Sequence, residues 1–191
     1  MPVEQIAGVD EVGRGALFGP VVAAAVILPA EAVSPLKTAG VTDSKRLSAA
    51  KRQQLASTIW QTAHCSLGMA SVYEIDRINI LQASLLAMSR AISQLYPQPK
   101  LCLIDGNQQI KQLAIAQETV VKGDQSELAI AAASIIAKVW RDELIVRLDK
   151  RYPGYDLASN KGYGSAKHKA GIAQMGISRQ HRKSFRSCQL P

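Results

Sequence analysis

Short apolar runs separated by turn-forming residues recur along the chain and predict strands. The first two, at 6–10 and 21–28, are rich in β-branched residues and flank a glycine-dense stretch at 13–20. That arrangement is typical of two strands joined by a turn. Similar runs predict three more strands, at 66–72, 101–104 and 118–121.

Other segments carry apolar residues at the spacing of helices. Ser48 is placed to cap a helix over 48–60, and prolines end a helix over 80–95. The stretch 125–151 contains neither Gly nor Pro and predicts the longest helix of the chain, and a short helix is expected at 165–175. This order of elements suggests an α/β fold, with one mixed five-stranded sheet flanked by helices.

Composition is that of one globular unit. The chain has 191 residues, 47% hydrophobic and 20% charged, which suffices for a core and predicts a single domain over 1–191. The net charge is +8. Residues 1–137 are balanced in Lys/Arg and Asp/Glu, so the whole excess lies in 138–191. The irregular basic C-terminal segment, about 152–191, predicts duplex binding, although a merely solvated basic surface would look the same.

Location signals point to the cytoplasm. Cys65, Cys102 and Cys188 are odd in number and far apart, so they form neither a disulfide framework nor a CxxC zinc site. The segment 1–4 lacks the basic and then apolar pattern of a signal peptide, and the run 21–28 is too short to span a bilayer. We therefore expect a cytoplasmic protein with no membrane contact.

Four carboxylates carry the candidate chemistry. Asp10 and Asp105 directly follow apolar strands, Glu11 adjoins the first, and Asp124 precedes the long helix. Strand ends are where α/β proteins place ligand sites. Mg²⁺ binds few carboxylates and completes its shell with water and phosphate oxygens, so such a cluster indicates metal chemistry on a phosphate.

Each acid also has a structural interpretation. Asp124 with Glu127 three residues later fits a capping box, which explains Asp124 without catalysis. Asp105 before Gly106 fits a turn. Neighbouring strand residues point to opposite faces, so Asp10 and Glu11 reach one metal only if the strand ends or bulges there.

These residues lie in motifs that resemble the ribonuclease HII family. Gly8-Val-Asp-Glu-Val-Gly-Arg-Gly15 resembles its N-terminal signature, and Leu103-Ile-Asp-Gly-Asn107 its second acidic motif. Further matches follow in the family's order and cover nearly the whole chain: Asp43 to Ser48, Val121 to Asp124, Ala131 to Asp142, Lys161 to Gly164, and His181 to Phe185. Thr42 and Ser165 depart from it slightly, with threonine for asparagine and serine for threonine.

The resemblance implies a ribonuclease H-like fold and two-metal catalysis by Mn²⁺ or Mg²⁺. Its catalytic and metal-binding residues would be Asp10, Glu11, Asp105 and Asp124. The substrates would be RNA/DNA hybrids and duplex DNA with embedded ribonucleotides, cut on the 5′ side of a ribonucleotide to leave 3′-hydroxyl and 5′-phosphate ends. The implied substrate-binding residues are Gly13, Arg14, Gly15, Ser44, Lys45, Lys161, Tyr163 and Ser165.

Within that set, the Gly13 to Gly15 stretch would read the 2′-hydroxyl, and Tyr163 would pack on the sugar of the following deoxynucleotide. Without the motif, Tyr163 would be taken as a partly buried tyrosine with an exposed hydroxyl. Candidate phosphate contacts are Lys45, Lys161, Lys167, Lys169, Arg182 and Lys183. His168 and His181 lack partners at metal-ligand spacing, so we expect structural or phosphate-facing roles for them.

Three alternatives compete with this interpretation. Another two-metal nuclease of the same fold, transposase-like or junction-cutting, would not need the Gly-Arg-Gly and Lys-Gly-Tyr motifs. A non-catalytic duplex-binding module would not need the carboxylates. A nucleotide-binding phosphotransferase ranks last because neither GxxxxGK[ST] nor a properly spaced GxGxxG is present. A monomer is the simplest expectation, and the tail 187–191 is too short to argue for a contact with a replication clamp.

Overall fold

The fold is built on one mixed sheet. The computed structural model describes residues 5–111 and 113–189, so the segment 1–4 and the last two residues of the tail lie outside the described part. Strand order is β3-β2-β1-β4-β5. The bounds are β1 Ile6–Val12, β2 Val21–Ile27, β3 His64–Ala70, β4 Leu101–Asp105 and β5 Ala116–Val120. β2 pairs antiparallel with both β1 and β3, whereas β4 pairs parallel with both β1 and β5. The expected mixed five-stranded sheet is confirmed.

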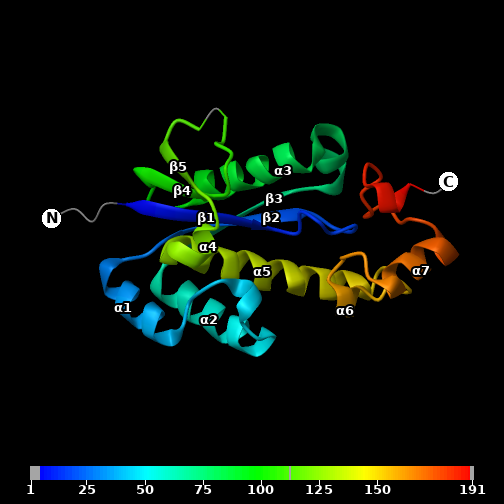
Figure 1. Ribbon diagram of the computed structural model, residues 1–191, viewed down its shortest axis with the longest axis horizontal. Coiled ribbons are helices and arrows are strands. Elements are labelled where there is room, and N and C mark those ends of the chain that lie inside the picture. The colour runs from blue at the N-terminus through cyan, green and yellow to red at the C-terminus, as the bar shows by residue number, and fades with distance from the viewer. Residues whose placement is uncertain (1–4, 112, 190–191) are drawn as a thin grey trace.

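Helices cover both faces of this sheet (Figure 1). α3 (Val72–Gln94) packs on one face, and α5 (Leu128–Asp149) with α2 (Ala49–Thr62) lies on the other. Also present are α1 (Ala30–Ala39), α4 (Gly123–Ser126), α6 (Leu157–Asn160) and α7 (Ala166–Met175), with 3-10 turns at Ser44–Arg46 and Arg186–Cys188. Within the described residues, no helix combines the length and apolarity that crossing a bilayer requires.

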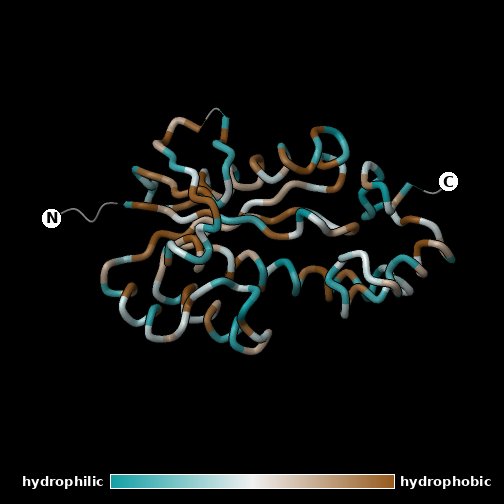
Figure 2. The backbone as a smooth tube through the Cα atoms, viewed as in Figure 1, coloured by the Kyte–Doolittle hydropathy of each residue, from teal (hydrophilic) through white to brown (hydrophobic). Residues whose placement is uncertain are grey.

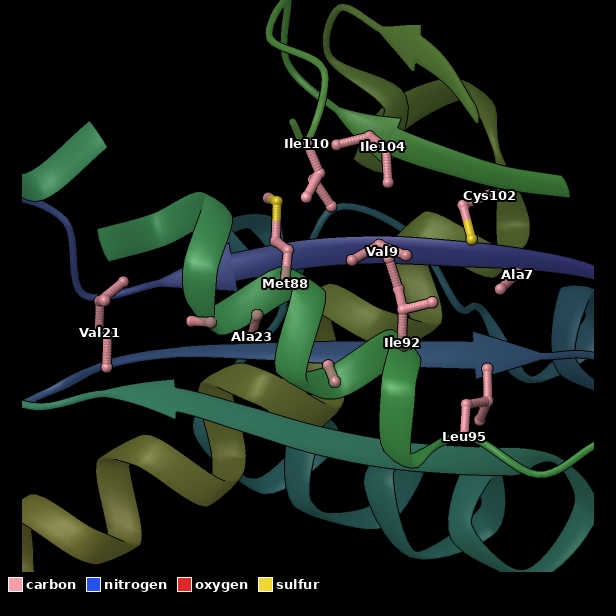
Figure 3. Close-up of a cluster of buried hydrophobic side chains, with 14 of the residues drawn as sticks. Ala7, Val9, Val21, Ala23, Met88, Ile92, Leu95, Cys102, Ile104 and Ile110 are labelled. Carbon is pink, nitrogen blue, oxygen red and sulfur yellow. The ribbon is translucent and has the colours of Figure 1, made fainter. Parts of the chain in front are cut away.

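Two apolar cores follow from the alternation along the strands. β2 is buried throughout; Ala23 and Ala25 face the α3 side, whereas Ala24 and Val26 face the α5 side. Figure 3 shows the first core, with Met88 and Ile92 of α3 directed at the sheet. Hydrophobic residues follow the central strands and the helix faces against them (Figure 2).

A glycine in β1 lets α5 pack unusually close to the sheet. A Cβ on Gly8 would lie 2.1 Å from the backbone carbon of Ala129, a separation that no side chain tolerates. The N-terminal part of α5 is thereby pressed against the strand that carries Asp10 and Glu11.

Several helix predictions need correction. α1 was not predicted, because Pro29 and Pro35 hide its helical period. The helix predicted over 80–95 is the second part of α3 and follows a break at Asn79, whose φ is 65°, whereas the first part of α3, from Val72 to the break, was not predicted. The segment 125–151 is split, since Glu127 is extended between α4 and α5. α3 spans 23 residues only when its two parts are counted across the break, so the 22-residue α5 is the longest unbroken helix of the described residues, as predicted.

The C-terminal segment packs around the far end of α5. Its apolar residues form a third cluster with the glycine-rich stretch that follows β1, composed of Leu17, Phe18, Ile145, Tyr155, Leu157, Ile172 and Cys188. Phe18 pairs with His181 in an isolated antiparallel bridge. Segments far apart in the sequence therefore meet beside the end of β1.

Candidate active site

Asp10 and Asp105 lie side by side on neighbouring parallel strands. The last pair in the β1–β4 register is Val9 with Ile104, and the two aspartates are the next residue of each strand. Asp10 is 6% exposed, and its Oδ1 accepts a hydrogen bond of 2.7 Å from the amide of Glu11. The sequence prediction that these acids form a cluster at strand ends is consistent with this register.

Glu11 is presented differently from what the sequence suggested. β1 does not end or bulge at Asp10, because its pairing with β2 continues regularly to Val12. Glu11 therefore points to the α3 side, where it lines a small cavity shared with Asp105. Its Oε1 lies 3.2 Å from the Arg14 guanidinium. Asp105 is the last residue of β4 and lines the same cavity.

Asp124 joins the cluster through the turn before α5. The amide of Gly123 donates a 2.8 Å hydrogen bond to Asp105 Oδ1, which fixes this turn against the end of β4. Asp124 is 5% exposed, and its Oδ2 lies 3.5 Å from Nζ of Lys45. The capping-box interpretation is wrong, since Asp124 lies inside α4 and neither α4 nor α5 has a side-chain cap in the described structure.

The electrostatics of the cluster are those of crowded acids. Burial raises the pKa of Asp10 well above its ordinary value, and the charges of Glu11 and Asp105 raise it further. Burial also raises the pKa of Glu11, against the opposing charge of Arg14. The pKa of Asp105 is raised by burial and by Asp124, against the hydrogen bond from Gly123. A divalent cation would relieve this repulsion.

The donor chemistry fits a hard divalent ion. All four candidates offer carboxylate oxygens, the ligands that Mg²⁺ and Mn²⁺ favour. Ser84 Oγ, a buried polar atom without a partner, lines the cavity beside Glu11 and Asp105. In the described chain, however, no three His, Cys, Asp or Glu side chains form a ready-made metal-binding group. Water and substrate phosphate would have to complete the shell of any ion here.

The segments expected to bind substrate lie beside this cluster. Gly13 has φ of +92°, and a Cβ there would lie 2.2 Å from Nε of Arg141, so the turn requires glycine. Arg14 and Gly15 are exposed. Tyr163 is half-buried, with its ring 5.6 Å from both Nζ of Lys138 and the guanidinium carbon of Arg141.

The remaining expected binding residues differ in accessibility. Ser44 is buried and hydrogen-bonds to Ser134 Oγ at 2.9 Å, whereas Lys45 has an 82% exposed side chain. Ser165 caps α7 by accepting from the amide of His168. Lys161 is half-buried and its Nζ contacts the carbonyl of Ala158. Only part of the predicted set is free to touch a ligand directly.

Four of the basic residues proposed for phosphate contact are exposed, namely Lys45, Lys167, Lys169 and Lys183. Arg182 needs correction, because it is fully buried and donates three hydrogen bonds to the carbonyls of Gly19 and Arg14. His168 and His181 are also fully buried, which rules out their phosphate-facing role and leaves the structural one.

Arg141 was missed by the sequence reasoning. Its guanidinium is fully buried and donates to the carbonyls of Phe18, Pro20 and Lys161 at 2.9–3.0 Å. It thus joins the glycine-rich stretch to the segment that carries Tyr163. Its spacing could have predicted its burial, because Arg141 lies four residues from both Ala137 and Ile145, on the buried face of α5.

Comparisons with known proteins agree with the fold. The family model described as Ribonuclease HII matches residues 7–188. Curated relatives called Ribonuclease HII include one from Acaryochloris marina, 67% identical over 97% of this chain and 94% of its own length. Another, from Trichodesmium erythraeum, is 64% identical over 96% of this chain and 87% of its own.

Solved structures agree as well. The ribonuclease HII of Archaeoglobus fulgidus, solved as a complex with PCNA, superposes with a TM-score of 0.80 at 26% identity, covering 97% of each chain. The protein called Bst-RNase HIII, solved in complex with Mn²⁺, has a TM-score of 0.79 over 96% of this chain and 68% of its own. At 19% identity, the latter supports the fold alone.

Proposed function

Because this chain belongs to the ribonuclease HII family, and so to the nucleases of the ribonuclease H class, we propose that it hydrolyses the RNA strand of RNA/DNA hybrids and nicks duplex DNA on the 5′ side of embedded ribonucleotides. The products carry 3′-hydroxyl and 5′-phosphate ends. The chemistry depends on two divalent ions, Mn²⁺ or Mg²⁺. Support for divalent metal comes from the carboxylate donor set of Asp10, Glu11, Asp105 and Asp124.

One observation carries the proposal. Asp10 and Asp105 stand side by side where the parallel pairing of β1 with β4 ends, close to the turn at Gly13. Burial raises the pKa of both carboxyls, and neighbouring acids raise each further, namely Glu11 and Asp105 for Asp10, and Asp124 for Asp105. The site therefore favours an arriving cation. A purely structural pair would have been placed beside Lys or Arg at hydrogen-bond distance.

We assign Asp10 and Asp105 to anchor the ions, with Glu11 and Asp124 completing their shells. When bound, two divalent ions would lower the pKa of the attacking water and stabilise charge on the attacking and leaving oxygens. The Gly123 amide, which donates to Asp105, orients that carboxylate. The Arg14 guanidinium pairs with Glu11 and keeps that carboxylate on the α3 side.

Recognition falls to the exposed groups around the cluster. Arg14 has a 52% exposed side chain, and Gly15 leaves open space for a close strand. These groups would meet the ribose and its 2′-hydroxyl, the atom that separates RNA from DNA. Tyr163 would pack on the next sugar, and Lys45, Lys161, Lys167, Lys169 and Lys183 would position phosphates.

We further propose a monomeric, cytoplasmic enzyme whose single domain spans 1–191. The free thiols of Cys65, Cys102 and Cys188 suit a reducing compartment. The Archaeoglobus fulgidus protein was solved with PCNA, which makes a sliding clamp the partner to test. Co-elution of the full chain with the clamp of its own organism would support that contact.

The test is cleavage of three duplexes: DNA with one ribonucleotide, the same DNA without it, and a long RNA/DNA hybrid. Each is incubated with Mg²⁺, Mn²⁺ or EDTA. We expect metal-dependent cutting of the first and third, with the nick 5′ of the ribonucleotide, and an intact all-DNA duplex. Binding without cutting would favour a duplex-binding module, and cutting of the all-DNA duplex would favour another nuclease of this fold.

A matched pair of variants assigns the chemistry. Asp105→Asn removes a proposed metal ligand from β4, whereas Glu118→Gln alters an exposed acid on the adjacent β5. We expect only the first to lose turnover, with both retaining the circular dichroism of the wild type. Full activity in Asp105→Asn would contradict the assigned role.

A further inference from the structure

A chain of buried hydrogen bonds ends on the backbone of Tyr163. The amide and the hydroxyl of Ser178 both lie 2.9 Å from Nδ1 of His181. Nε2 of His181 lies 3.1 Å from Nε2 of His168. Nδ1 of His168 lies 2.9 Å from the carbonyl oxygen of Tyr163. Both imidazoles are fully buried, so each contact takes place away from water.

These contacts allow one arrangement of protons. A backbone N–H only donates, so Nδ1 of His181 must accept from Ser178 and its neutral ring carries the proton on Nε2. Nε2 of His168 must then accept that proton's hydrogen bond, which leaves Nδ1–H of His168 to donate to the Tyr163 carbonyl. The pKa of His181 is lowered to about 4 by burial and by His168, in agreement with two neutral rings.

We propose that His168 and His181 are positioning residues that hold Tyr163 in place for reading the RNA-to-DNA junction, an inference that rests on the proposed function. Neither imidazole touches the nucleic acid. Their effect passes through the Tyr163 carbonyl, and it should appear in substrate selectivity rather than in the chemical step.

The backbone around Tyr163 needs this support. Lys161 and Gly162 have φ of 53° and 84°, so two successive residues adopt left-handed conformations, one of them without the freedom of glycine. The Tyr163 carbonyl also accepts from the amide of Ser165 at 2.8 Å. With His168 as second donor, both lone pairs of that oxygen are used, and the peptide plane after Tyr163 is fixed.

The same pair ties Tyr163 to the glycine-rich stretch. His181 forms the antiparallel bridge with Phe18, and the two rings meet edge to face at 5.1 Å. Gly162, next to Tyr163, accepts a 2.8 Å hydrogen bond from the amide of Leu17. A shift of the histidine pair would therefore move Tyr163 relative to Arg14 and Gly15, which are expected to read the ribose.

The proton arrangement can be tested without any substrate. Long-range ¹H–¹⁵N spectra of the imidazoles report which ring nitrogen is protonated. We expect Nε2–H for His181 and Nδ1–H for His168. The third histidine of the chain is the exposed His64, and His64→Asn identifies its signals. The reverse tautomers, or a charged ring at neutral pH, would overturn the inference.

Two substitutions of His168 separate positioning from space filling. His168→Asn can place an amide N–H where Nδ1 stands, toward the Tyr163 carbonyl, but does not reach His181. His168→Gln can reach His181 but leaves the carbonyl without that donor. The readout is the ratio of kcat/KM on a lone ribonucleotide in DNA to kcat/KM on a long hybrid.

We expect His168→Gln to lower this ratio at least about tenfold, the order of factor that one hydrogen bond is worth, and His168→Asn to stay within about threefold. Equal ratios in both variants, or a parallel fall on both substrates, would show a merely structural role. If His168→Gln does not fold, His181→Gln and His181→Asn repeat the comparison, since only the former offers a donor toward His168. His64→Gln is the matched surface control.

Failure of the proposed function is distinguishable from failure of this inference. A wild-type protein that cuts neither substrate would overturn the proposed function and with it the role at the junction, while the imidazole spectra would still decide whether the hydrogen-bond chain exists. A wild-type protein that cuts both substrates, with unaltered selectivity in both His168 variants, would overturn the inference alone.

Discussion

Charge is buried in two regions of this molecule, with different numbers of partners. At the end of β1 and β4, Asp10 accepts from one backbone amide and Asp124 faces one exposed lysine. Beside them, Arg141 and Arg182 each donate three hydrogen bonds to backbone carbonyls. The acids keep lone pairs available, while the guanidiniums have used most of their donors.

The difference separates groups that can bind a ligand from groups that fix chain segments in place. A saturated buried cation has little capacity left for a ligand, but it fixes the chain segments whose carbonyls it binds. Crowded carboxylates with raised pKa values are costly unless something positive arrives. Substitutions among the acids should therefore lower activity without lowering the free energy of unfolding. Substitutions of the buried arginines should lower the free energy of unfolding.

The largest expected effect is on turnover at the acidic end. Asp10→Asn keeps the size of the side chain but removes a proposed metal anchor, so we expect kcat to fall at least about a hundredfold. Its unfolding free energy should stay level or rise, because the substitution removes a buried, repelled charge. Turnover is measured on the hybrid with Mn²⁺, and stability by urea unfolding without metal.

The pH dependence of the same variant sharpens this test. The folded state raises the pKa of Asp10, so the carboxyl favours folding when protonated, below its ordinary pKa of 3.8, and this contribution is lost as pH rises through the folded value. Asp10→Asn should gain stability relative to the wild type as pH rises through that window. A constant difference would mean that the pKa of Asp10 is not raised.

The next effect is on folding, in the basic region. Arg141→Met would leave the carbonyls of Phe18, Pro20 and Lys161 without their donors. At about 1–3 kcal/mol for each buried unsatisfied group, we expect a loss of at least about 3 kcal/mol of unfolding free energy. Arg151→Met, at an exposed position just after α5, is the control. An equal, small loss in both variants would contradict the holding role.

Much of the fold followed from the sequence because its signals are local. The continuous apolar run of β2 and the Ser48 cap of α2 were sufficient to place those elements. Where long-range packing decides, the prediction failed. The separation of α4 from α5 has no strong local signal, and Pro35 inside α1 is typical of a helix breaker.

The site shows the same division. Asp10 and Asp105 were predicted to belong to one site because each directly follows an apolar strand, and the register of β1 with β4 agrees. The role of Arg182 was misassigned because a basic residue in a basic segment gives no sign of burial. The contact between His168 and His181 joins residues 13 positions apart. His168 lies in α7 and His181 in the segment after it, so no helical or strand periodicity predicts that they meet.

A third effect is a sensitivity to acid that the histidine pair adds. Burial lowers the pKa of His181 from 6.5 to about 4, so its contribution to stability is complete above pH 6.5 and is lost as pH falls toward 4. By linkage the loss amounts to up to about 3 kcal/mol. Melting temperatures of wild type, His181→Asn and His64→Asn across this range test it. The slope should flatten only in His181→Asn.

The smallest effect on stability is expected at Lys45, the exposed cation of the acidic end. Its Nζ lies 3.5 Å from Asp124, but the side chain is 82% exposed, so water and salt screen the pair. Lys45→Ala should change the unfolding free energy by no more than about 0.5 kcal/mol. If Lys45 positions a phosphate, KM should rise and the salt dependence of binding should weaken, because one fewer counterion is released. A large loss of unfolding free energy, comparable to that of Arg141→Met, would contradict the distinction between cations that bind substrate and cations that stabilise the fold.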